Sequence, residues 1–243
     1  MQKVVKPYEP DSSKKEQVSK MFDNIAPKYD LLNRVLSLGI DTIWRKKMIE
    51  KIRSIDPKQI LDVATGTGDV ALEAQKRLQP DFITGVDISH EMLEVGREKI
   101  RKKGLSEFIR LDLGDSENLP YDDNSFDAVT VAFGVRNYEN LEKGMREMNR
   151  VLRPGGKLVV LEFSRPTMFP FKQLYNFYFK NILPTIGKLT SKDQRAYSYL
   201  YESVQTFPDG EDFLGVMKNT GYTKPDLQPL TLGICTIYTG EKE

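Results

Sequence analysis

The sequence predicts a Rossmann-like α/β domain, in which a mostly parallel seven-stranded sheet carries helices on both faces and ends in an antiparallel strand. Short apolar runs alternate with helical patterns between residues 58 and 164, and such βαβ units build parallel sheets. Two further β-type runs, at 223–230 and 234–239, follow each other with no helix between them. Strands joined that closely pair antiparallel, because a parallel connection needs a longer crossover.

The same pattern divides the chain into segments. A helical cap is expected first, because Ser13 and Glu16 form a capping-box pattern and a second helical stretch follows Asp41 and ends before Pro57. The predicted segments are the N-terminal helical cap (1–57), the core (58–164), an aromatic insertion (165–208), and a C-terminal helix with a strand pair (209–243).

The core strands are predicted at short apolar runs, at 59–64, 82–87, 108–113, 126–133 and 157–163. The helices between them end at residues that stop helices, namely Pro80, Gly104 and the Arg-Pro-Gly-Gly run 153–156. Ser89 is the expected N-cap of the second of these helices. The carboxyl ends of the parallel strands then share one edge, where such sheets bind ligands.

The insertion at 165–208 follows the fifth strand at this edge and is rich in aromatic residues: Phe169, Phe171, Tyr175, Phe177, Tyr178, Phe179, Tyr197, Tyr199, Tyr201 and Phe207. Basic residues lie among them: Lys172, Lys180, Lys188, Lys192 and Arg195. The insertion is interpreted as a lid, whose aromatic side chains either form its own core or line a groove for an apolar substrate. The mixture of aromatic and basic residues is also typical of a surface that docks on a membrane.

Composition excludes several classes of protein. A formal net charge of +1 provides no general attraction for nucleic acid, so no nucleic-acid partner is predicted. The single cysteine, Cys235, and the single histidine, His90, exclude an internal disulfide and the usual His/Cys metal sites, and no metal is predicted. Cys235 is expected in the core and His90 on a helix surface.

The charged N-terminal residues do not resemble a signal peptide, and no apolar run approaches the ~18 residues of a spanning helix. A cytoplasmic location is expected, and the sequence carries no signal of oligomeric state.

A glycine loop joins the first strand to the first core helix, at 62–69. Gly66 and Gly68 allow a ligand to approach the backbone, and the following helix offers unpaired amides. With Ala71 in third place, and Asp87 at the distance expected of a ribose ligand, the loop also fits a dinucleotide-binding pattern. A nicotinamide or flavin enzyme is therefore the alternative from another class.

The surrounding residues favour S-adenosylmethionine over a dinucleotide. Acidic residues end or follow successive strands: Asp62, Asp87, Asp112 and Asp115. They suit a cationic sulfonium that carries a ribose and no phosphate, whereas they would repel a pyrophosphate. A long helical segment precedes the first strand, and no second nucleotide-binding half follows the fifth. S-adenosylmethionine is therefore the predicted methyl donor.

Several segments resemble those of one methyltransferase family: 21–33 (MFDNIAPKYDLLN) with 37–41 (SLGID) and Trp44-Arg45, 65–69 (TGTGD), 133–137 (FGVRN), and 153–157 (RPGGK) with 161–164 (LEFS). Through them the chain is similar to the ubiquinone/menaquinone biosynthesis C-methyltransferases over nearly its whole length.

This resemblance implies a class I methyltransferase fold and methylation of a ring carbon on a polyprenylated quinol. The quinol is either demethylmenaquinol or a 2-methoxy benzoquinol of the ubiquinone route, and overall likeness to bacterial members favours demethylmenaquinol. The resemblance also implies donor contacts from Thr67, Asp87, Asp115 and Ser116. Ala132 stands where relatives commonly have serine, so no side-chain contact is expected there.

Methyl transfer to carbon needs an electron-rich ring, which an ionised quinol hydroxyl supplies. Because a neutral phenol has a pKa of about 10, the enzyme must remove that proton or stabilise the phenolate. Arg136, just past the fourth strand, is the predicted stabilising cation, and Asn137 is expected to orient the hydroxyl. Tyr29 and Asp30 of the cap are expected to close over donor and quinol, and Glu162 is an alternative base.

Overall fold

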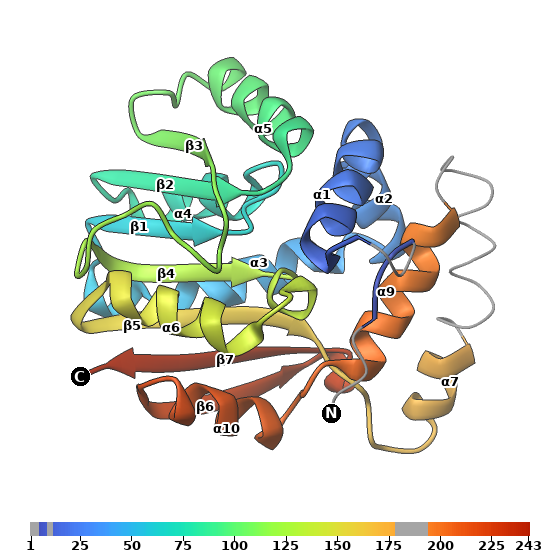
Figure 1. Ribbon diagram of the computed structural model, residues 1–243. Coiled ribbons are helices and arrows are strands. Elements are labelled where there is room, and N and C mark those ends of the chain that lie inside the picture. The colour runs from blue at the N-terminus through green and yellow to red at the C-terminus, as the bar shows by residue number, and fades with distance from the viewer. Residues whose placement is uncertain (1–4, 9–11, 178–193) are drawn as a thin grey trace.

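The computed structural model describes residues 5–8, 12–177 and 194–243, and its sheet has the strand order β3-β2-β1-β4-β5-β7-β6 (Figure 1). The strands are β1 (Gln59–Val63), β2 (Phe82–Asp87), β3 (Ile109–Leu113), β4 (Phe126–Ala132), β5 (Leu152–Phe163), β6 (Tyr222–Leu230) and β7 (Cys235–Lys242). The first five strands pair parallel with one another, and β7 pairs antiparallel with both β5 and β6. The predicted fold class is confirmed, with the last strand inside the sheet and β6 at its edge.

The described α-helices are α1 (Lys14–Ile25), α2 (Tyr29–Leu36), α3 (Ile40–Glu50), α4 (Asp69–Leu78), α5 (His90–Lys102), α6 (Leu141–Val151), α7 (Phe171–Phe177), α9 (Gln194–Thr206) and α10 (Glu211–Asn219). Short 3-10 turns include η1 (Ala26–Lys28), η2 (Arg53–Ile55), η3 (Val135–Asn137) and η5 (Thr231–Gly233). The capping box at the start of α1 is confirmed, since the Glu16 amide donates to the Ser13 hydroxyl and the Ser13 amide donates to the Glu16 carboxylate.

The fifth strand differs from its prediction at one end. It begins at Leu152 rather than at residue 157, because Leu152 pairs with Phe126 before Lys157 pairs with Ala128. The Arg-Pro-Gly-Gly run between them ends α6, as predicted, and also forms an irregularity within β5. The end of a helix can be predicted from the neighbouring residues, whereas the pairing of Leu152 depends on Phe126 in another strand, β4.

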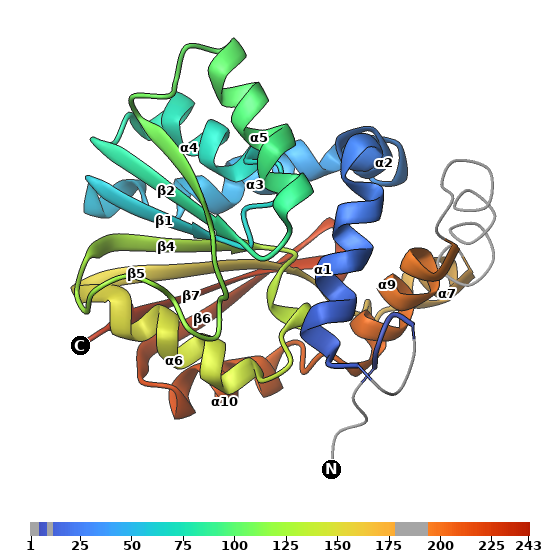
Figure 2. The same ribbon diagram turned by 45° about the horizontal axis from the view of Figure 1, so that its top comes forward.

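Helices cover both faces of the sheet (Figure 2). On one face α6 and α10 contribute the buried side chains Met145, Met148, Phe213 and Met217. On the other face α3, α4 and α5 contribute Trp44, Met48, Ala71 and Leu93. Cys235 is buried in this second core and His90 is exposed at the start of α5, in agreement with the sequence.

The remaining helices gather beyond the carboxyl ends of the parallel strands. There α1 and α2 of the cap lie beside α7 and α9 of the insertion (Figures 1 and 2). The cap and the insertion share a third core, formed by Val18, Met21, Leu32, Tyr175, Ala196, Tyr199 and Val204. Of the insertion residues singled out in the sequence, Tyr178, Phe179, Lys180, Lys188 and Lys192 lie outside the described residues.

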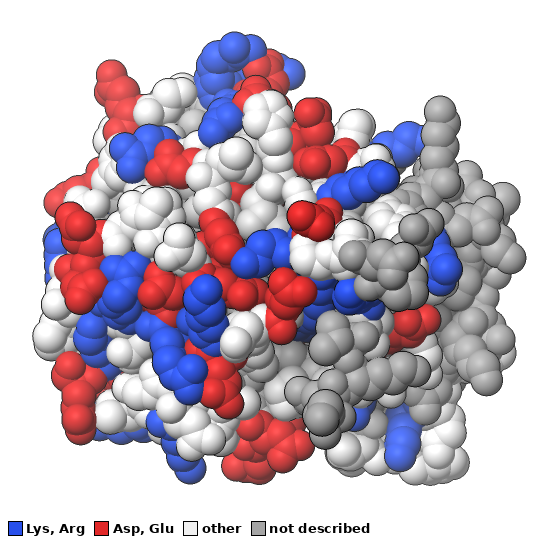
Figure 3. Space-filling view, in the orientation of Figure 1, with Lys and Arg blue, Asp and Glu red and all other residues white. Residues whose placement is uncertain are grey.

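Acidic and basic side chains are interspersed over the described surface seen in Figure 3. None of the described helices has the length and apolar character needed to cross a bilayer. Within the same described ranges, no three His, Cys, Asp or Glu residues gather in a way that could hold a metal ion.

Candidate active site

The loop between β1 and α4 brings backbone to the carboxyl edge of the sheet. Gly66 and Gly68 have φ values of 55° and 78°, in the left-handed region that side chains disfavour. The Gly66 amide donates to Asp87 Oδ2 at 2.8 Å, and the Ser89 amide donates to Asp87 Oδ1 at 2.9 Å. Burial raises the pKa of Asp87, and these amide donors oppose the shift. The end of β2 is thus held against the glycine loop.

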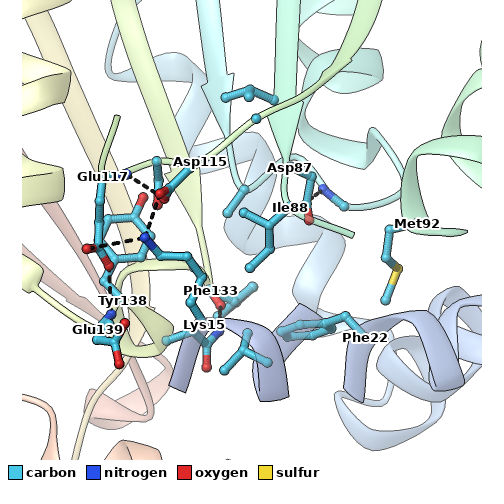
Figure 4. Close-up of a pocket in the computed structure, with 18 of the residues that line it drawn as sticks. Lys15, Phe22, Asp87, Ile88, Met92, Asp115, Glu117, Phe133, Tyr138 and Glu139 are labelled. Atoms are coloured by element: carbon cyan, nitrogen blue, oxygen red, sulfur yellow. Dashed lines mark hydrogen bonds and ion pairs between the residues drawn. The ribbon is translucent and has the colours of Figure 1, made fainter. Parts of the chain in front are cut away.

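A first cavity lies above this loop and contains most of the predicted donor contacts (Figure 4). Among its lining residues are Gly66, Asp87, Asp115 and Ser116. Lys15 of α1 extends along its wall, with Nζ 2.5 Å from Asp115 Oδ2 and 3.6 Å from Glu117 Oε2. The four acidic lining residues are Asp87, Asp115, Glu117 and Glu139. Their charge suits a cationic ligand and disfavours one with phosphates.

Asp62, Thr67 and Gly68, which were also predicted to contact the donor, are not among the lining residues of this cavity. The Asp62 carboxylate accepts hydrogen bonds from the Thr65 and Thr130 hydroxyls at 2.6 and 2.7 Å. Burial raises the pKa of Asp62 to about 6, against the effect of both hydroxyls. Asp62 therefore braces the glycine loop against β4.

Asp30, predicted to be catalytic, contacts the glycine loop from the cap. Its carboxylate accepts from the Thr67 hydroxyl at 2.6 Å and from Lys99 Nζ at 2.8 Å. Lys99 also donates to Asp69 at 2.6 Å, so one cation joins α2, α4 and α5. Asp30 lines an open, charged cleft beside these helices and does not line the first cavity. This geometry favours an anchoring role for its carboxylate.

A second cavity, of about 400 Å³, lies between the cap and the insertion. Its walls come from α1, α2 and α3, from the end of β5, and from α7, α9 and η5, and they are mostly apolar. A volume of this size is in the range of small-molecule sites, roughly 300–1,000 Å³. The cavity is therefore suited to an apolar ligand.

The two cavities adjoin each other, because four residues line both of them: Phe22, Tyr29, Phe133 and Asn137. The rings of Phe22 and Tyr29 pack edge to face at 6.0 Å. Phe133 has a φ of 59°, which is unusual for a residue with a side chain, and such conformations are concentrated at functional sites. Tyr29 and Asn137, both predicted site residues, thus lie where the two cavities adjoin.

Arg136 lines the second cavity and forms a buried ion pair. Its Nη1 lies 2.8 Å from Glu162 Oε1 and also donates to the Phe133 carbonyl. The guanidinium carbon lies 5.5 Å from the centre of the Phe163 ring. Burial raises the pKa of Glu162, and the neighbouring Arg136 opposes that shift. Arg136, the predicted stabilising cation, and Glu162, the predicted alternative base, thus form an ion pair with each other.

Three buried polar atoms around the second cavity have no hydrogen-bond partner among the described residues: Arg136 Nε, Asn137 Oδ1 and Tyr199 Oη. Each belongs to a residue that lines the cavity. Buried polar groups are nearly always satisfied in proteins, so donors and an acceptor left in this way favour a ligand that bonds to them.

Residues from α1 take part in the site although the sequence did not indicate them. Lys14 Nζ donates to the carbonyls of Arg136 and Tyr138 at 3.1 and 2.8 Å, and burial lowers its pKa to about 8. Lys14 thereby positions η3, whereas Lys15 lines the first cavity. In the sequence, both lysines occur in the first turn of a helix, where lysines are usually solvated.

Solved structures with this fold include S-adenosylmethionine-dependent methyltransferases. A possible histamine N-methyltransferase of Thermotoga maritima has a TM-score of 0.65 and 16% identity, covering 93% of this chain and 99% of that one. A putative S-adenosyl-L-methionine-dependent methyltransferase of Methanococcus maripaludis has a TM-score of 0.65 and 18% identity, covering 97% and 96%. A [4+2]-cyclase, SpnF, has a TM-score of 0.66, 19% identity and coverage of 96% and 98%. At this identity the likeness shows the fold alone.

Sequence relatives are much more similar. A demethylmenaquinone methyltransferase of Bacteroides fragilis is 52% identical over 241 residues, or 99% of this chain and 98% of the relative. A ubiquinone/menaquinone biosynthesis C-methyltransferase of Geotalea daltonii is 48% identical over 232 residues, or 95% and 98%. The model of the ubiE/COQ5 methyltransferase family matches residues 11–242. The resemblance found in the sequence is confirmed: this chain is a methyltransferase of the ubiE/COQ5 family.

Proposed function

We propose that this chain transfers a methyl group from S-adenosylmethionine to a ring carbon of a polyprenylated quinol, and that the quinol is demethylmenaquinol. The observation that carries the proposal is the junction of an acidic cavity with a larger apolar one. A group can pass directly between two ligands only where their sites touch. The demethylmenaquinone methyltransferases that are about half identical to this chain support the choice of quinol.

The residues of the acidic cavity fit the donor, which when bound supplies an electrophilic methyl group on a sulfonium. Asp87 would bond to the ribose hydroxyls beside the Gly66 backbone, because the backbone amides that it now accepts leave part of its acceptor capacity unused. Asp115 and Ser116 line the same cavity and would contact the rest of the donor. We assign Asp62, Thr67 and Gly68 the task of shaping the loop.

The apolar cavity would hold the quinol ring at the junction and the start of its tail toward the insertion. Arg136 would stabilise the ring hydroxyl as a phenolate, since its Nε is a donor that no described residue satisfies. Glu162 would hold the guanidinium in place, and its raised pKa also makes it the alternative acceptor of the quinol proton.

Tyr29 and Asn137 would position the ring between the two ligands. The Asn137 side-chain amide donates to the Phe133 carbonyl at 3.3 Å, which leaves its oxygen able to accept from a ring hydroxyl. Burial raises the pKa of Tyr29, so its phenol stays protonated and acts as a donor and as a wall of the junction.

A polyprenyl tail resides in a bilayer, so the protein must meet a membrane surface to reach its substrate. We propose a peripheral contact at the inner face of the membrane through residues 165–208. Exposed Met168, Phe169 and Phe177 on and before α7 support this contact, together with exposed Lys172 and Arg195.

The decisive experiment is incubation of the pure protein with methyl-labelled donor and a panel of quinols, followed by mass spectrometry of the ring. Label should enter the ring of demethylmenaquinol faster than that of a 2-methoxy benzoquinol. Calorimetry should show binding of S-adenosylhomocysteine and none of NAD. Absence of ring label with every quinol, or tight NAD binding, would contradict the proposal.

A further inference from the structure

An apolar rim occupies the α2–α3 turn and η5. It is defined by Leu31, Val35, Leu38 and Leu232, whose side chains are 65%, 47%, 86% and 55% exposed. Leu31 and Val35 are spaced i and i+4, so they form an apolar stripe on one side of α2, and Leu38 follows in the turn. Leu38 and Leu232 both line the second cavity, so the rim brings together the turn after α2 and a leucine from a distant part of the chain.

The exposure of this stripe is not a by-product of burying the other side of α2. Leu32 is buried in the core shared with the insertion, and Leu36 lines the second cavity. Those two residues already give α2 its inward apolar face. A helix with an apolar face toward the protein and a second one toward solvent is typical of a segment that contacts something else.

Leu38 and Leu232 both occupy backbone conformations that favour glycine. The Leu38 amide bonds to the Val35 carbonyl and the Gly39 amide to the Arg34 carbonyl, at 3.2 and 2.9 Å. This is the Schellman ending of a helix, in which glycine is the usual residue at the position of Leu38. Leu38 has a φ of 51°, and Leu232 has a φ of 59° within η5. Because both side chains are exposed, they contribute little to packing. The stability of the fold therefore does not explain why leucine occupies these two positions.

The two leucines stand at the entrance of the apolar cavity. Both line it and both are more than half exposed, so the cavity reaches the surface beside them. The turn and η5 are held together by Trp44, whose indole donates to the Thr231 hydroxyl at 2.8 Å. Leu38 and Leu232 thus form one fixed apolar entrance.

We propose that this rim rests in the lipid bilayer, with Leu38 and Leu232 among the acyl chains. The polyprenyl tail then passes between them from the lipid into the cavity without crossing water. This inference rests on the proposed function, because a quinol tail is what makes a lipid-facing entrance useful. It places a docking surface on the cap, at a site separate in the sequence from residues 165–208.

The test uses the double variant Leu38→Gly/Leu232→Gly and vesicles of phosphatidylethanolamine and phosphatidylglycerol. Glycine removes both side chains and relieves both left-handed conformations, so the melting temperature should stay the same or rise. In co-sedimentation, the wild type should bind the vesicles, and the double variant should bind at least about tenfold more weakly. The control Phe108→Ser removes an exposed apolar side chain just before β3, at the opposite edge of the sheet, and should bind as the wild type does.

Equal vesicle binding by the wild type and the double variant would overturn the inference, as would a wild type that binds no vesicles. A wild-type dimer in sedimentation velocity that the double variant loses would also overturn it, because a second copy would then cover the rim. Vesicle binding is measured without donor or quinol. The ring-labelling assay can therefore fail, and refute the proposed function, while the rim still binds lipid.

Discussion

Replacing Arg136 by glutamine removes a buried guanidinium from the apolar cavity and leaves Glu162 without its cation. The two side chains are buried and 2.8 Å apart. Breaking a buried pair by removing one partner typically costs about 3–5 kcal/mol, because the remaining charge is unpaired in a poorly solvated place. Arg136→Gln is therefore expected to lower the free energy of unfolding by that order at neutral pH, besides any effect on the rate.

The pH dependence of this loss identifies its cause. Burial raises the pKa of Glu162 while Arg136 opposes the shift, so the variant should raise that pKa further. The folded variant then binds a proton more tightly than the unfolded chain, in which glutamate titrates near 4.3. The destabilisation is present above the folded pKa and is relieved as the pH falls through it. Melting curves between about pH 8 and pH 5 should show the variant approaching the wild type toward acid.

The double variant Arg136→Gln/Glu162→Gln separates stability from chemistry, since it leaves a neutral pair that can still hydrogen-bond. It should recover most of the lost stability. If the guanidinium stabilises the phenolate, kcat with demethylmenaquinol should still be about 10²-fold below that of the wild type. The residual rate should rise toward alkaline pH, because the quinol then ionises unaided near pH 10. A double variant with the kcat of the wild type would refute the reasoning and show that the phenolate is stabilised elsewhere.

Asp87→Asn should weaken the binding of S-adenosylhomocysteine at least about tenfold in calorimetry, because a hydrogen bond from a ribose hydroxyl to a charged acceptor contributes ~1.5–3 kcal/mol. Unchanged affinity would refute the ribose assignment. The pKa of about 6 for Asp62 lies above its unfolded value, so the contribution of Asp62 to the stability of the wild type should fall by roughly 3 kcal/mol as the pH rises from about 4 to 6. In chemical denaturation, the difference in stability between the wild type and Asp62→Asn should change by that amount over the same pH range, and parallel curves would contradict the assignment. Tyr199→Phe should raise KM for the quinol without lowering the melting temperature, since no described residue bonds its hydroxyl; an unaltered KM would show that the quinol does not bond it either.

The fold could be predicted because its signals are local. Apolar runs, N-caps and glycines near the ends of helices alternate along the core, and their order alone indicates a parallel sheet. Pairing between distant segments could not be predicted in the same way. The early start of β5 at Leu152 depends on its pairing with Phe126, and the insertion of β7 between β5 and β6 depends on contacts across the whole sheet.

The residues of the candidate site likewise fall into those that could be predicted from the sequence and those that could not. Asp87 and Asp115 could be expected together, because they end or follow strands whose carboxyl ends share one edge, and the family resemblance added Ser116. The place of Lys15 in the site could not be predicted, because its partner Asp115 is 100 residues away in the sequence. The residues around Lys15 indicate only the start of a helix. The bond between Arg136 and Glu162 likewise joins the ends of two neighbouring strands, and it determines how either side chain can act.

Tyr29 and Asp30 show how helix geometry can refine such an interpretation. The sequence places both in the cap, and both were expected to close over the ligands. Neighbouring residues on a helix point about 100° apart, since one turn holds about 3.6 residues, so they do not share a face. Tyr29 accordingly lines the junction of the cavities, while Asp30 turns to Thr67 and Lys99. In the proposed function, Tyr29 is thus the one of the two that would meet the quinol, whereas Asp30 ties the helix that carries it to the glycine loop.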